Sequence, residues 1–447
     1  MITPVVVAGG EGYTAWVDAV KRVGQKFVHA SGARFRVVSA GRQSGKTRLA
    51  IVEICEDAMS HGGHVNWWVT VNLEIKATVW RELLDFLPPE VIKGKPNKVE
   101  RRIELTNGSQ IFVKSAAGDD SLTSAALNFL VCDEAALWKH EAWSRGVEPM
   151  LVARPDSRVL LISTPRGHNW FYRLWQLGDR RGCVQCDKDR TKCSVHDPDY
   201  DSFTWKTEDS PYADLAFLAA ARRTTPEDIY AQEYEANPLD SSGGVFKRVR
   251  DRVSNFPFQA DEATVLGVDV GQAVDFTAII PMNSARQALY CKRTQDDWPV
   301  QTAIIVSESI RNKFARVVAD SISKDGDAFI STLRQAGLAV QAVPTTSAAI
   351  KTAVINTLRL AFEQGTLQIP NDAVLVEELE AYTYKIDSET GHVSYFGPEG
   401  HHDDTVMALA LAYWGQKHTV ANVSPKKEDT YVRSRDGLRE RQRRYVH

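Results

Sequence analysis

The chain has 447 residues, of which 43% are apolar and 25% charged, a composition typical of a globular protein with room for two domains of ordinary size. The net charge of −3 does not indicate a nucleic-acid binder, so any contact with DNA must depend on local basic surface. The N-terminus lacks the pattern of a signal peptide, and no apolar run approaches the roughly 18 residues of a membrane helix, so we expect a cytoplasmic protein without membrane contact.

Short apolar runs alternate with helical stretches in the first third of the chain. The runs that we predict to be strands cover residues 34–40, 64–71, 101–106, 110–116, 128–136 and 158–165. Most are apolar on both faces, as expected for a mainly parallel sheet that is covered by helices on both sides. We therefore predict an α/β domain over residues 1–169. Residues 170–236, which are polar and helical in their second half, are predicted to form a lid subdomain on this domain.

A glycine-rich loop follows the first of these strands. Residues 40–47 read AGRQSGKT and precede a predicted helix, which is the context of a phosphate-binding loop. In such a loop the backbone amides bind phosphate oxygens, Lys46 reaches the β and γ phosphates, and Thr47 offers its hydroxyl to Mg²⁺. Ala40 replaces the first glycine of the motif, and a glycine-rich turn before a helix is the alternative interpretation. The predicted ATP-binding residues are Gly41, Arg42, Gln43, Ser44, Gly45, Lys46 and Thr47.

Two carboxylates follow the apolar strand that begins at residue 129. Asp133 suits coordination of Mg²⁺, and Glu134 stands where a base that polarises the attacking water is expected. A charge pair at a strand edge is the alternative for an isolated Asp-Glu. The strand at residues 158–165 ends in hydroxyls, like the strand that senses the γ phosphate in motor ATPases. Arg42 is predicted to neutralise charge in phosphoryl transfer, and a surface salt bridge is its alternative.

A cluster of metal-ligand residue types lies in the predicted lid subdomain. Its members have the close spacing of a small zinc knuckle and are Cys183, Cys186, Cys193 and His196. Four protein ligands leave no open position for a substrate, so the predicted zinc is structural. Surface thiols without a metal are the alternative.

A second pattern begins after residues 237–247, which have the turn-forming composition of a linker. Three short strands are predicted at residues 264–271, 276–283 and 288–295, and helices then alternate with strands at residues 316–320 and 339–343. This order is that of a ribonuclease H-like fold, which we assign to residues 248–418. Residues 419–447 are predicted to be a mobile tail, because eight Lys and Arg outnumber four Asp and Glu between residues 425 and 447.

Four aspartates occupy defined positions in this second domain. Asp269 lies within an apolar strand, Asp320 ends a strand, and Asp403 and Asp404 open the last helix. Ribonuclease H-like nucleases use carboxylates in this arrangement to hold two Mg²⁺ or Mn²⁺ ions, which activate water and stabilise the leaving oxygen. The alternatives are a helix N-cap for Asp404 and a turn residue for Asp320. Further candidates are Asp275 and His402 near the metals, and Lys351 as a contact to a DNA phosphate.

Several of these segments resemble successive motifs of the large terminase subunits of tailed bacteriophages. The matching pieces are GRQSGKT, NWWVTVN, LVCDEAA and LISTPRGHNWFYRLW in the first domain, and GVDVGQAVDFTAI, VVADS and HHDDTVMALALA in the second. In that family a glutamine before the loop contacts adenine, which implies this role for Gln25. The family usually has Leu-Arg-Gly before the acidic strand, whereas this chain has Leu122-Thr-Ser124. The cysteine cluster is an insert that the family pattern lacks.

The resemblance implies an ATP-driven motor that moves double-stranded DNA into a viral prohead, and a nuclease that cuts the DNA concatemer. It implies as partners the DNA, the portal protein, the small terminase subunit and further copies of the chain in a ring, expected to be a pentamer. The implied location is the cytoplasm of the infected bacterial host and, transiently, the prohead portal, but not the mature virion. A non-viral DNA repair or recombination enzyme is the alternative.

Overall fold

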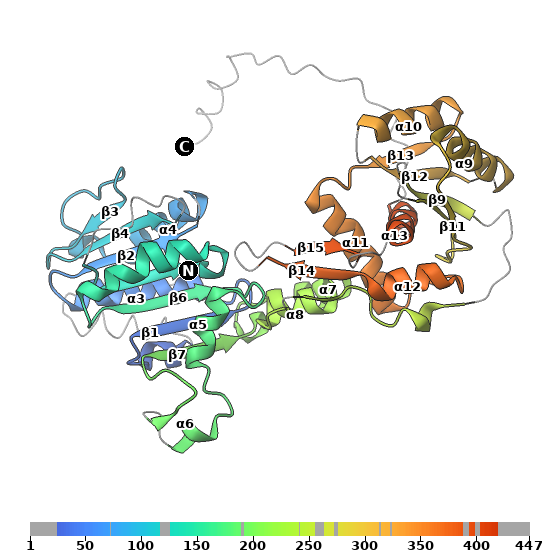
Figure 1. The fold of residues 1–447 in the computed structure, drawn as a ribbon. Helices are drawn as coiled ribbons and strands as arrows, with labels where there is room; N and C mark the ends of the chain where they lie inside the picture. Colours follow the sequence, from blue (N-terminus) through green and yellow to red (C-terminus); the bar gives the residue numbers. More distant parts are fainter. Residues whose placement is uncertain are drawn as a thin grey trace, which may run out of the picture.

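The computed structural model describes residues 25–71, 73–116, 126–188, 192–240, 242–254, 263–271, 276–312, 314–321, 324–387, 393–397 and 403–418. They form two α/β units, one from the N-terminal half of the chain and one from the C-terminal half (Figure 1). Asp275, His402 and the predicted tail at residues 419–447 lie outside the described residues. In the described part of the chain, no helix combines the length and apolarity that crossing a membrane requires.

The first unit contains a seven-stranded sheet in the order β3 (Arg102–Glu104), β4 (Gln110–Ser115), β2 (Val65–Thr70), β5 (Phe129–Asp133), β6 (Arg158–Ser163), β1 (Phe35–Ala40) and β7 (Tyr200–Trp205). All neighbouring strands are parallel except β3, which is antiparallel to β4. The prediction of a mainly parallel sheet is therefore confirmed. The sequence does not predict β7, because this half-buried edge strand lacks the continuous apolar run of the others.

Helices cover both faces of this sheet (Figure 1). On one face lie α3 (Lys46–Ser60) and α4 (Leu73–Phe86), and on the other lie α5 (Trp170–Gly178), η3 (Ala135–Leu137), η4 (Ala142–Val147) and η5 (Glu148–Ala153). Successive strand residues enter different cores, since Val38 packs with α3 whereas Val37 packs with α5. Burial on both faces explains why these strands are apolar throughout.

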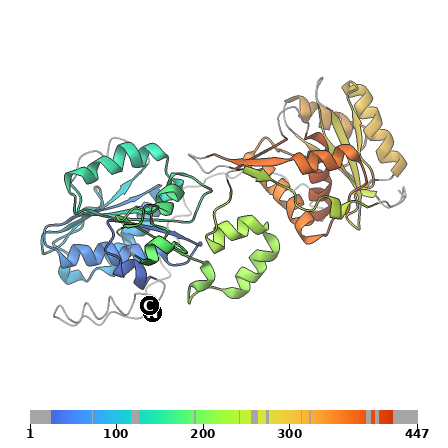
Figure 2. The same cartoon turned by 60° about the horizontal axis from the view of Figure 1, so that its bottom comes forward.

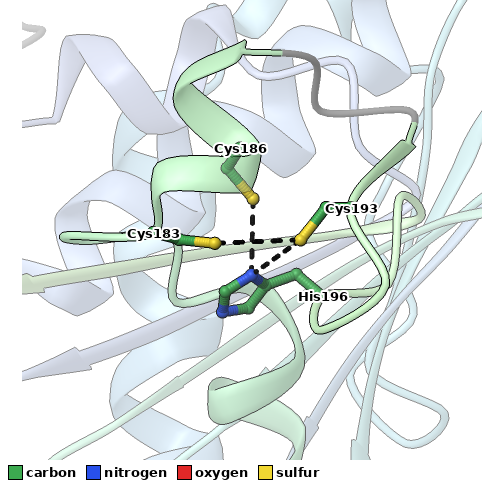
Figure 3. A group of neighbouring side chains, drawn as sticks. All are labelled: Cys183, Cys186, Cys193 and His196. Atoms are coloured by element: carbon green, nitrogen blue, oxygen red, sulfur yellow. Dashed lines mark hydrogen bonds between the residues drawn. The ribbon is translucent and has the colours of Figure 1, made fainter.

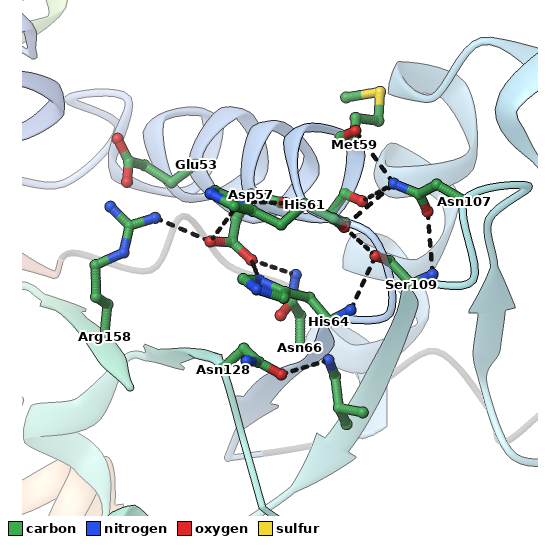
Figure 4. Close-up of polar contacts among 12 residues, drawn as sticks. Glu53, Asp57, Met59, His61, His64, Asn66, Asn107, Ser109, Asn128 and Arg158 are labelled. Carbon is green, nitrogen blue, oxygen red and sulfur yellow. Dashed lines mark hydrogen bonds and ion pairs between the residues drawn. The ribbon is translucent and has the colours of Figure 1, made fainter. Parts of the chain in front are cut away.

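A polar network fixes the end of α3 that lies away from the phosphate-binding loop (Figure 4). The buried Asp57 carboxylate pairs with Arg158 Nη2, His64 Nδ1 and Asn66 Nδ2, each at 2.9 Å. Arg158 opens β6 and Asn66 lies at the start of β2, so one carboxylate joins the helix to two strands. Because this end of α3 is anchored to the sheet, its N-terminus is held in a defined position beside the loop.

Two helices of the predicted lid subdomain, α7 (Leu215–Thr224) and α8 (Glu227–Glu235), lie between the two units (Figure 2). Helix α8 contacts both of them. Its Glu233 pairs with Arg42 of the phosphate-binding loop, and its Asp228 pairs with Arg359 of the second unit. The short α6 (Val184–Lys188) lies apart from these helices, in a projection next to α5 and β7 (Figure 1). The remaining short helices of the first half are α2 (Lys26–Ala30), η1 (Pro89–Val91) and η7 (Thr207–Asp209).

The second unit contains a five-stranded sheet in the order β11 (Lys292–Thr294), β10 (Thr277–Asn283), β9 (Ala263–Asp269), β12 (Arg316–Asp320) and β13 (Val340–Val343). The first three strands are antiparallel, and β12 is parallel to both β9 and β13. Helices α9 (Trp298–Asn312) and α10 (Lys324–Gln335) pack on one face, and α11 (Ala348–Gln364), α12 (Ala373–Ala381) and α13 (Asp404–Lys417) on the other. This is the element order predicted for a ribonuclease H-like fold.

Helix α13 approaches β9 closely at Gly267. A Cβ on this glycine would lie 2.7 Å from Ala412 Cβ, so only glycine permits the contact. The contact places the N-terminus of α13, where Asp404 lies, next to the end of β9, where Asp269 lies.

A small antiparallel sheet in the order β15 (Val393–Phe396), β14 (Thr383–Ile386) and β8 (Ser242–Gly244) accompanies this unit, and η8 (Arg250–Arg252) follows β8. The sequence does not predict these short strands. Strand β8 falls within the segment predicted as a linker, and the neighbouring Val245 and Phe246 are buried in the core of the second unit. The segment thus contributes structure to the second unit as well as connecting the two.

Candidate functional sites

The phosphate-binding loop joins the end of β1 to the start of α3. Gly45 has φ 93° and Gln43 has φ 51°, so the loop turns through two left-handed residues before the helix begins. Ala40 is the last residue of β1 and is fully buried in the core. An alanine fits there because the position belongs to the strand, so the departure from the usual glycine does not disturb the loop.

Lys46 lies at the centre of this loop with its ammonium group buried. Its Nζ donates hydrogen bonds to Ala40 O at 3.0 Å, Gly41 O at 2.9 Å and Thr164 Oγ1 at 3.0 Å. Burial lowers the pKa of Lys46, and the nearby Glu134 and Asp133 carboxylates oppose this shift. The cation is thus held between the loop and the end of β6.

The acidic pair lies beside Lys46 at the end of β5. Asp133 is buried, and its burial, together with the charge of Glu134, raises its pKa to about 7 against the opposing effect of Lys46. Glu134 adopts a left-handed conformation with φ 49°, and its carboxylate accepts a hydrogen bond from Ser163 Oγ at 3.2 Å. The predicted acidic residues and the hydroxyl-bearing end of β6 are therefore brought together.

A pocket of about 600 Å³ opens in front of these groups. Its lining includes most of the predicted nucleotide-binding residues, namely Arg42, Gln43, Ser44, Gly45, Lys46, Thr47 and Glu134, as well as Thr164 and Arg166. Phosphate-binding backbone, a cation and a candidate base share one cavity, which suits a nucleoside triphosphate with its Mg²⁺.

Gln25 and Arg42 have partners within the protein. The buried Gln25 side chain donates from Nε2 to Gly45 O at 3.0 Å. The half-exposed Arg42 forms an ion pair with Glu233 of α8, which is the salt bridge that the alternative interpretation describes. Arg166 Nη1 also pairs with Glu233, at 2.6 Å. The sequence offers no local signal for Glu233, because the contact joins residues that lie far apart in the chain.

The lid also packs tightly against Gly41. A Cβ on this glycine would lie 2.7 Å from the backbone nitrogen of Thr207, and the Arg42 amide donates to Glu233 O at 2.8 Å. The loop therefore has direct contacts with the elements that connect it to the second unit.

The nuclease candidates gather at one edge of the second sheet. Asp269 ends β9 and Asp320 ends β12, and these strands are parallel neighbours, so both carboxylates lie at the same edge. Asp403 and Asp404 lie at the N-terminus of α13. Burial raises the pKa of Asp269 well above its ordinary range, and the charges of Asp320, Asp404 and Asp403 raise it further. A cation at this position would relieve that cost.

Each of the other acids has a polar partner. Asp320 accepts hydrogen bonds from the amide and the hydroxyl of Thr345. Asp404 Oδ2 lies 3.6 Å from Arg293 Nη2, and Asp403 Oδ2 lies 3.8 Å from Lys351 Nζ. Asp404 is buried whereas Asp403 is half-buried.

Sequence reasoning does not find Glu378 and Arg293, which belong to the same cluster. Glu378 of α12 accepts hydrogen bonds from the Thr405 amide at 3.0 Å and from the Thr405 hydroxyl, and it lies 3.7 Å from Arg293 Nη2. Burial raises the pKa of Glu378. Nothing in the acidic helix that carries it distinguishes Glu378 from its neighbours before the fold is known.

The four predicted zinc ligands come together in the projection formed by α6 and the following loop (Figure 3). Cys183 Sγ lies 3.8 Å from Cys193 Sγ, and His196 Nδ1 lies 3.3 Å from Cys186 Sγ and 3.4 Å from Cys193 Sγ. Desolvation would raise the pKa of Cys193, but hydrogen bonds from the Val195 amide, Cys186 and His196 lower it to about 6. Of the described groups whose ligand atoms all lie within 4.8 Å of one another, this is the one with four members, and the nuclease acids form no such group.

Comparison with known proteins relates both halves of the chain to one family. Residues 37–250 match the family model "Terminase large subunit, T4likevirus-type, N-terminal", and residues 266–414 match the model "Terminase RNaseH-like domain". The chain belongs to the large terminase family. The large terminase subunit of Thermus virus P23-45 is 28% identical to it over 90% of each chain. That of Escherichia phage T5 is 34% identical over 42% of this terminase and 41% of the phage protein.

Among solved structures, the large terminase ATPase domain of Thermus phage P74-26 is similar, with 25% identity and a TM-score of 0.45, covering 52% of this terminase and all of that chain. The family matches confirm the predicted α/β ATPase and ribonuclease H-like nuclease. This terminase is therefore an ATPase and a metal-dependent nuclease of viral DNA packaging, and these relatives do not support the non-viral alternative.

Proposed function

We propose that the pocket at the phosphate-binding loop hydrolyses ATP with named roles for its side chains. Lys46 binds the β and γ phosphates, and Thr47 and Asp133 position the Mg²⁺ that neutralises charge on the transferred phosphoryl group. Glu134 orients and deprotonates the attacking water, and its hydrogen bond to Ser163 fixes the direction of its carboxylate. The observation that carries this assignment is the buried Lys46 ammonium between the loop carbonyls and Thr164 at the edge of the pocket.

Arg42 reaches the same pocket, and its ion pair with Glu233 gives it a second role. As long as that pair is intact, Arg42 ties the loop to α8. Release from Glu233 would free the guanidinium to contact a phosphate, so Arg42 either stabilises charge in phosphoryl transfer or transmits the state of the loop to the lid. Gln25 contributes to the adenine side of the pocket through its contact with Gly45.

For the nuclease we propose a site that holds two Mg²⁺ or Mn²⁺ ions. Asp269, Asp320 and Asp404 supply the oxygen ligands, and Asp403 completes the set from the more exposed side. Burial makes ionisation of Asp269 unfavourable, as its raised pKa shows, and bound cations would stabilise the ionised carboxylate. Lys351, which pairs with Asp403, is placed to meet a DNA phosphate.

The cysteine cluster is proposed to hold one structural zinc. Three thiols and an imidazole are ligands that Zn²⁺ prefers, and all four ligand atoms lie within 4.8 Å of one another. Because all four positions would be filled by the protein, the zinc takes no part in hydrolysis.

As partners we propose double-stranded DNA, the portal protein, the small terminase subunit and further copies of this chain in a ring of five. These proposals rest on membership of the family. They place the protein in the cytoplasm of the infected bacterium and, during packaging, at the portal of the prohead.

Two reciprocal variants test the assignment of the sites. Glu134→Gln should bind ATP but not hydrolyse it, while cleaving plasmid DNA at the normal rate with Mg²⁺ or Mn²⁺ and no nucleotide. Asp269→Asn should show the opposite pattern, because it removes a metal ligand and leaves the ATP pocket intact. Normal ATPase in the first variant, or normal metal-supported cleavage in the second, would refute the corresponding role.

Zinc is tested separately by metal analysis of protein purified under reducing conditions without a chelator. We expect about one zinc per chain, and its loss from the double variant Cys183→Ser with Cys186→Ser. If the three clustered cysteines are shown to be reduced and no zinc is found, the interpretation as surface thiols without a metal holds instead.

A further inference from the structure

The cysteine cluster is linked to the ATP pocket through one arginine. Arg180, which is largely buried, donates from Nη1 to Cys186 Sγ at 3.5 Å and from Nη2 to the carbonyls of Asp197 and Tyr200, both at 2.8 Å. Its Nε donates to Asp201 Oδ1 at 3.4 Å. Arg180 thus joins a proposed zinc ligand to the first residues of β7, in the manner of the outer hydrogen bonds that orient metal ligands.

From this arginine, one route runs through Asp201 to the segment that carries Gln25. Asp201 Oδ2 accepts a hydrogen bond from Ser31 Oγ at 2.6 Å. Ser31 directly follows α2, whose N-cap is Gln25, and Gln25 holds Gly45 of the phosphate-binding loop. A cavity of about 430 Å³ lies between α2 and the cluster, with Phe27 and Ser31 in its lining on one side and Cys186 on the other.

A second route runs along β7 itself. This strand pairs with β1 over its whole length, and its last residue, Trp205, contacts the loop twice. The Trp205 carbonyl accepts from the Gly41 amide at 3.1 Å, and its indole Nε1 donates to Ser44 O at 3.3 Å. Arg180 therefore fixes one end of a strand whose other end supports the phosphate-binding loop.

We propose that the cysteine cluster, when it holds zinc, positions the ATP pocket through Arg180, Asp201 and Ser31. The three residues act as positioning residues, because none of them lines the pocket and each acts through α2 or β7. Their function is to set the placement of Gln25 and of the loop carbonyls, and hence the affinity for ATP. The chemical step depends on Lys46 and Glu134 and does not involve them. This inference rests on the zinc proposed above.

The measurement is the ATPase KM and kcat of the full chain, together with equilibrium binding of a fluorescent ATP analogue. Ser31→Ala and Asp201→Asn should each raise KM and the dissociation constant about fivefold, the factor expected for one hydrogen bond of average strength. The kcat should change by less than about twofold, and Ser31→Thr, which keeps the hydroxyl, should restore KM. Loss of zinc through Cys186→Ser should reproduce the rise in KM.

Arg181→Ala is the matched control, because the exposed guanidinium of this neighbouring arginine lies over the Trp175 ring and donates its hydrogen bonds to Asp179, not to the Asp201 and Cys186 side chains that Arg180 contacts. It should leave KM unchanged. Metal-supported plasmid cleavage should be normal in all these variants, which excludes general unfolding. A KM at the wild-type value in Asp201→Asn and Ser31→Ala overturns the inference, even if zinc is present. Absence of zinc from the wild-type protein overturns the zinc proposal, which metal analysis reports independently of KM.

Discussion

Replacing Asp133 by asparagine should make the nucleotide-free protein more stable while abolishing its ATPase activity. Asp133 is buried at the end of β5, beside Glu134, and this environment raises its pKa to about 7 from an ordinary value of 3.8. At neutral and alkaline pH the folded protein therefore carries a buried negative charge. This charge has a higher free energy there than in the unfolded chain, where water solvates it. Asparagine has nearly the same shape but no charge, so it avoids this cost, and it also loses the anionic ligand for Mg²⁺.

The shift of about 3 pKa units corresponds to about 4 kcal/mol at about 1.4 kcal/mol per unit. The folded-state pKa lies above the unfolded value, so with respect to this group the wild-type protein is most stable below about pH 4. That stability is lost as the pH rises from about 4 to about 7 and does not return at higher pH. The gain in Asp133→Asn should therefore approach 4 kcal/mol at pH 8 and be less than half of that at pH 5.

The assay is denaturant or thermal unfolding of metal-free and nucleotide-free protein at pH 5 and pH 8. At pH 8 the transition of the first unit should rise by roughly 10 °C, given about 2–4 °C per kcal/mol for a domain of this size. Asp156→Asn is the matched control, because Asp156 is exposed in the same unit. A variant no more stable than wild type at pH 8, or equally stabilised at both pH values, would refute the reasoning.

Three further changes test other parts of the structure. Lys46→Ala should abolish ATP turnover, measured as phosphate release, and spare metal-supported plasmid cleavage, because the loop loses the cation that contacts the phosphates; retained turnover would contradict this role. Gly267→Ala should destabilise the second unit by about 1–3 kcal/mol in thermal unfolding and weaken cleavage, since the added Cβ would displace α13 and with it Asp404. Gly244→Ala, whose Cβ would meet nothing within 4 Å, is its control, and equal stability of the two variants would contradict the argument. Deletion of residues 425–447 should leave both basal activities unchanged and impair packaging into proheads. If the deletion makes the salt dependence of DNA affinity shallower, the tail binds DNA; if the salt dependence is unchanged, the tail binds the portal. Normal packaging by the truncated protein would exclude both partners.

The elements that the sequence predicts are those whose signal is local. Strands buried on both faces, such as β1 and β5, are apolar throughout, and the phosphate-binding loop is a continuous motif. The edge strands β7 and β15 and the short strand β14 carry no such run, since each is only partly buried, and they are not predicted. The predicted acids of the nuclease come together because the ends of parallel strands share one edge of a sheet.

The residues that contact the predicted site residues could not be predicted from the sequence. Glu233 and Glu378 are distant in sequence from their partners, Arg42 and Arg293. Arg180 is only six residues from Cys186, but an arginine beside cysteines is no motif that predicts a contact. A charged residue on a helix gives no indication of its partner until the packing is known. Motifs thus predict the chemistry of the two active sites. They do not predict the contacts that position the site residues or the contacts that connect one site to the other.

Helix α11 connects the two active sites through the ion pairs of two of its residues. Lys351, near its first turn, pairs with Asp403 of the nuclease, and Arg359, near its last, is buried against Asp228 of α8. Helix α8 in turn contacts the phosphate-binding loop through the ion pair between Glu233 and Arg42. A helix of this length, about 25 Å, behaves as a stiff rod. A movement of the lid must therefore either tilt this rod, and shift the Lys351 ammonium that faces the nuclease acids, or separate Arg359 from Asp228. In the second case the buried guanidinium keeps one ion pair, with Glu363 at 3.3 Å on the same helix.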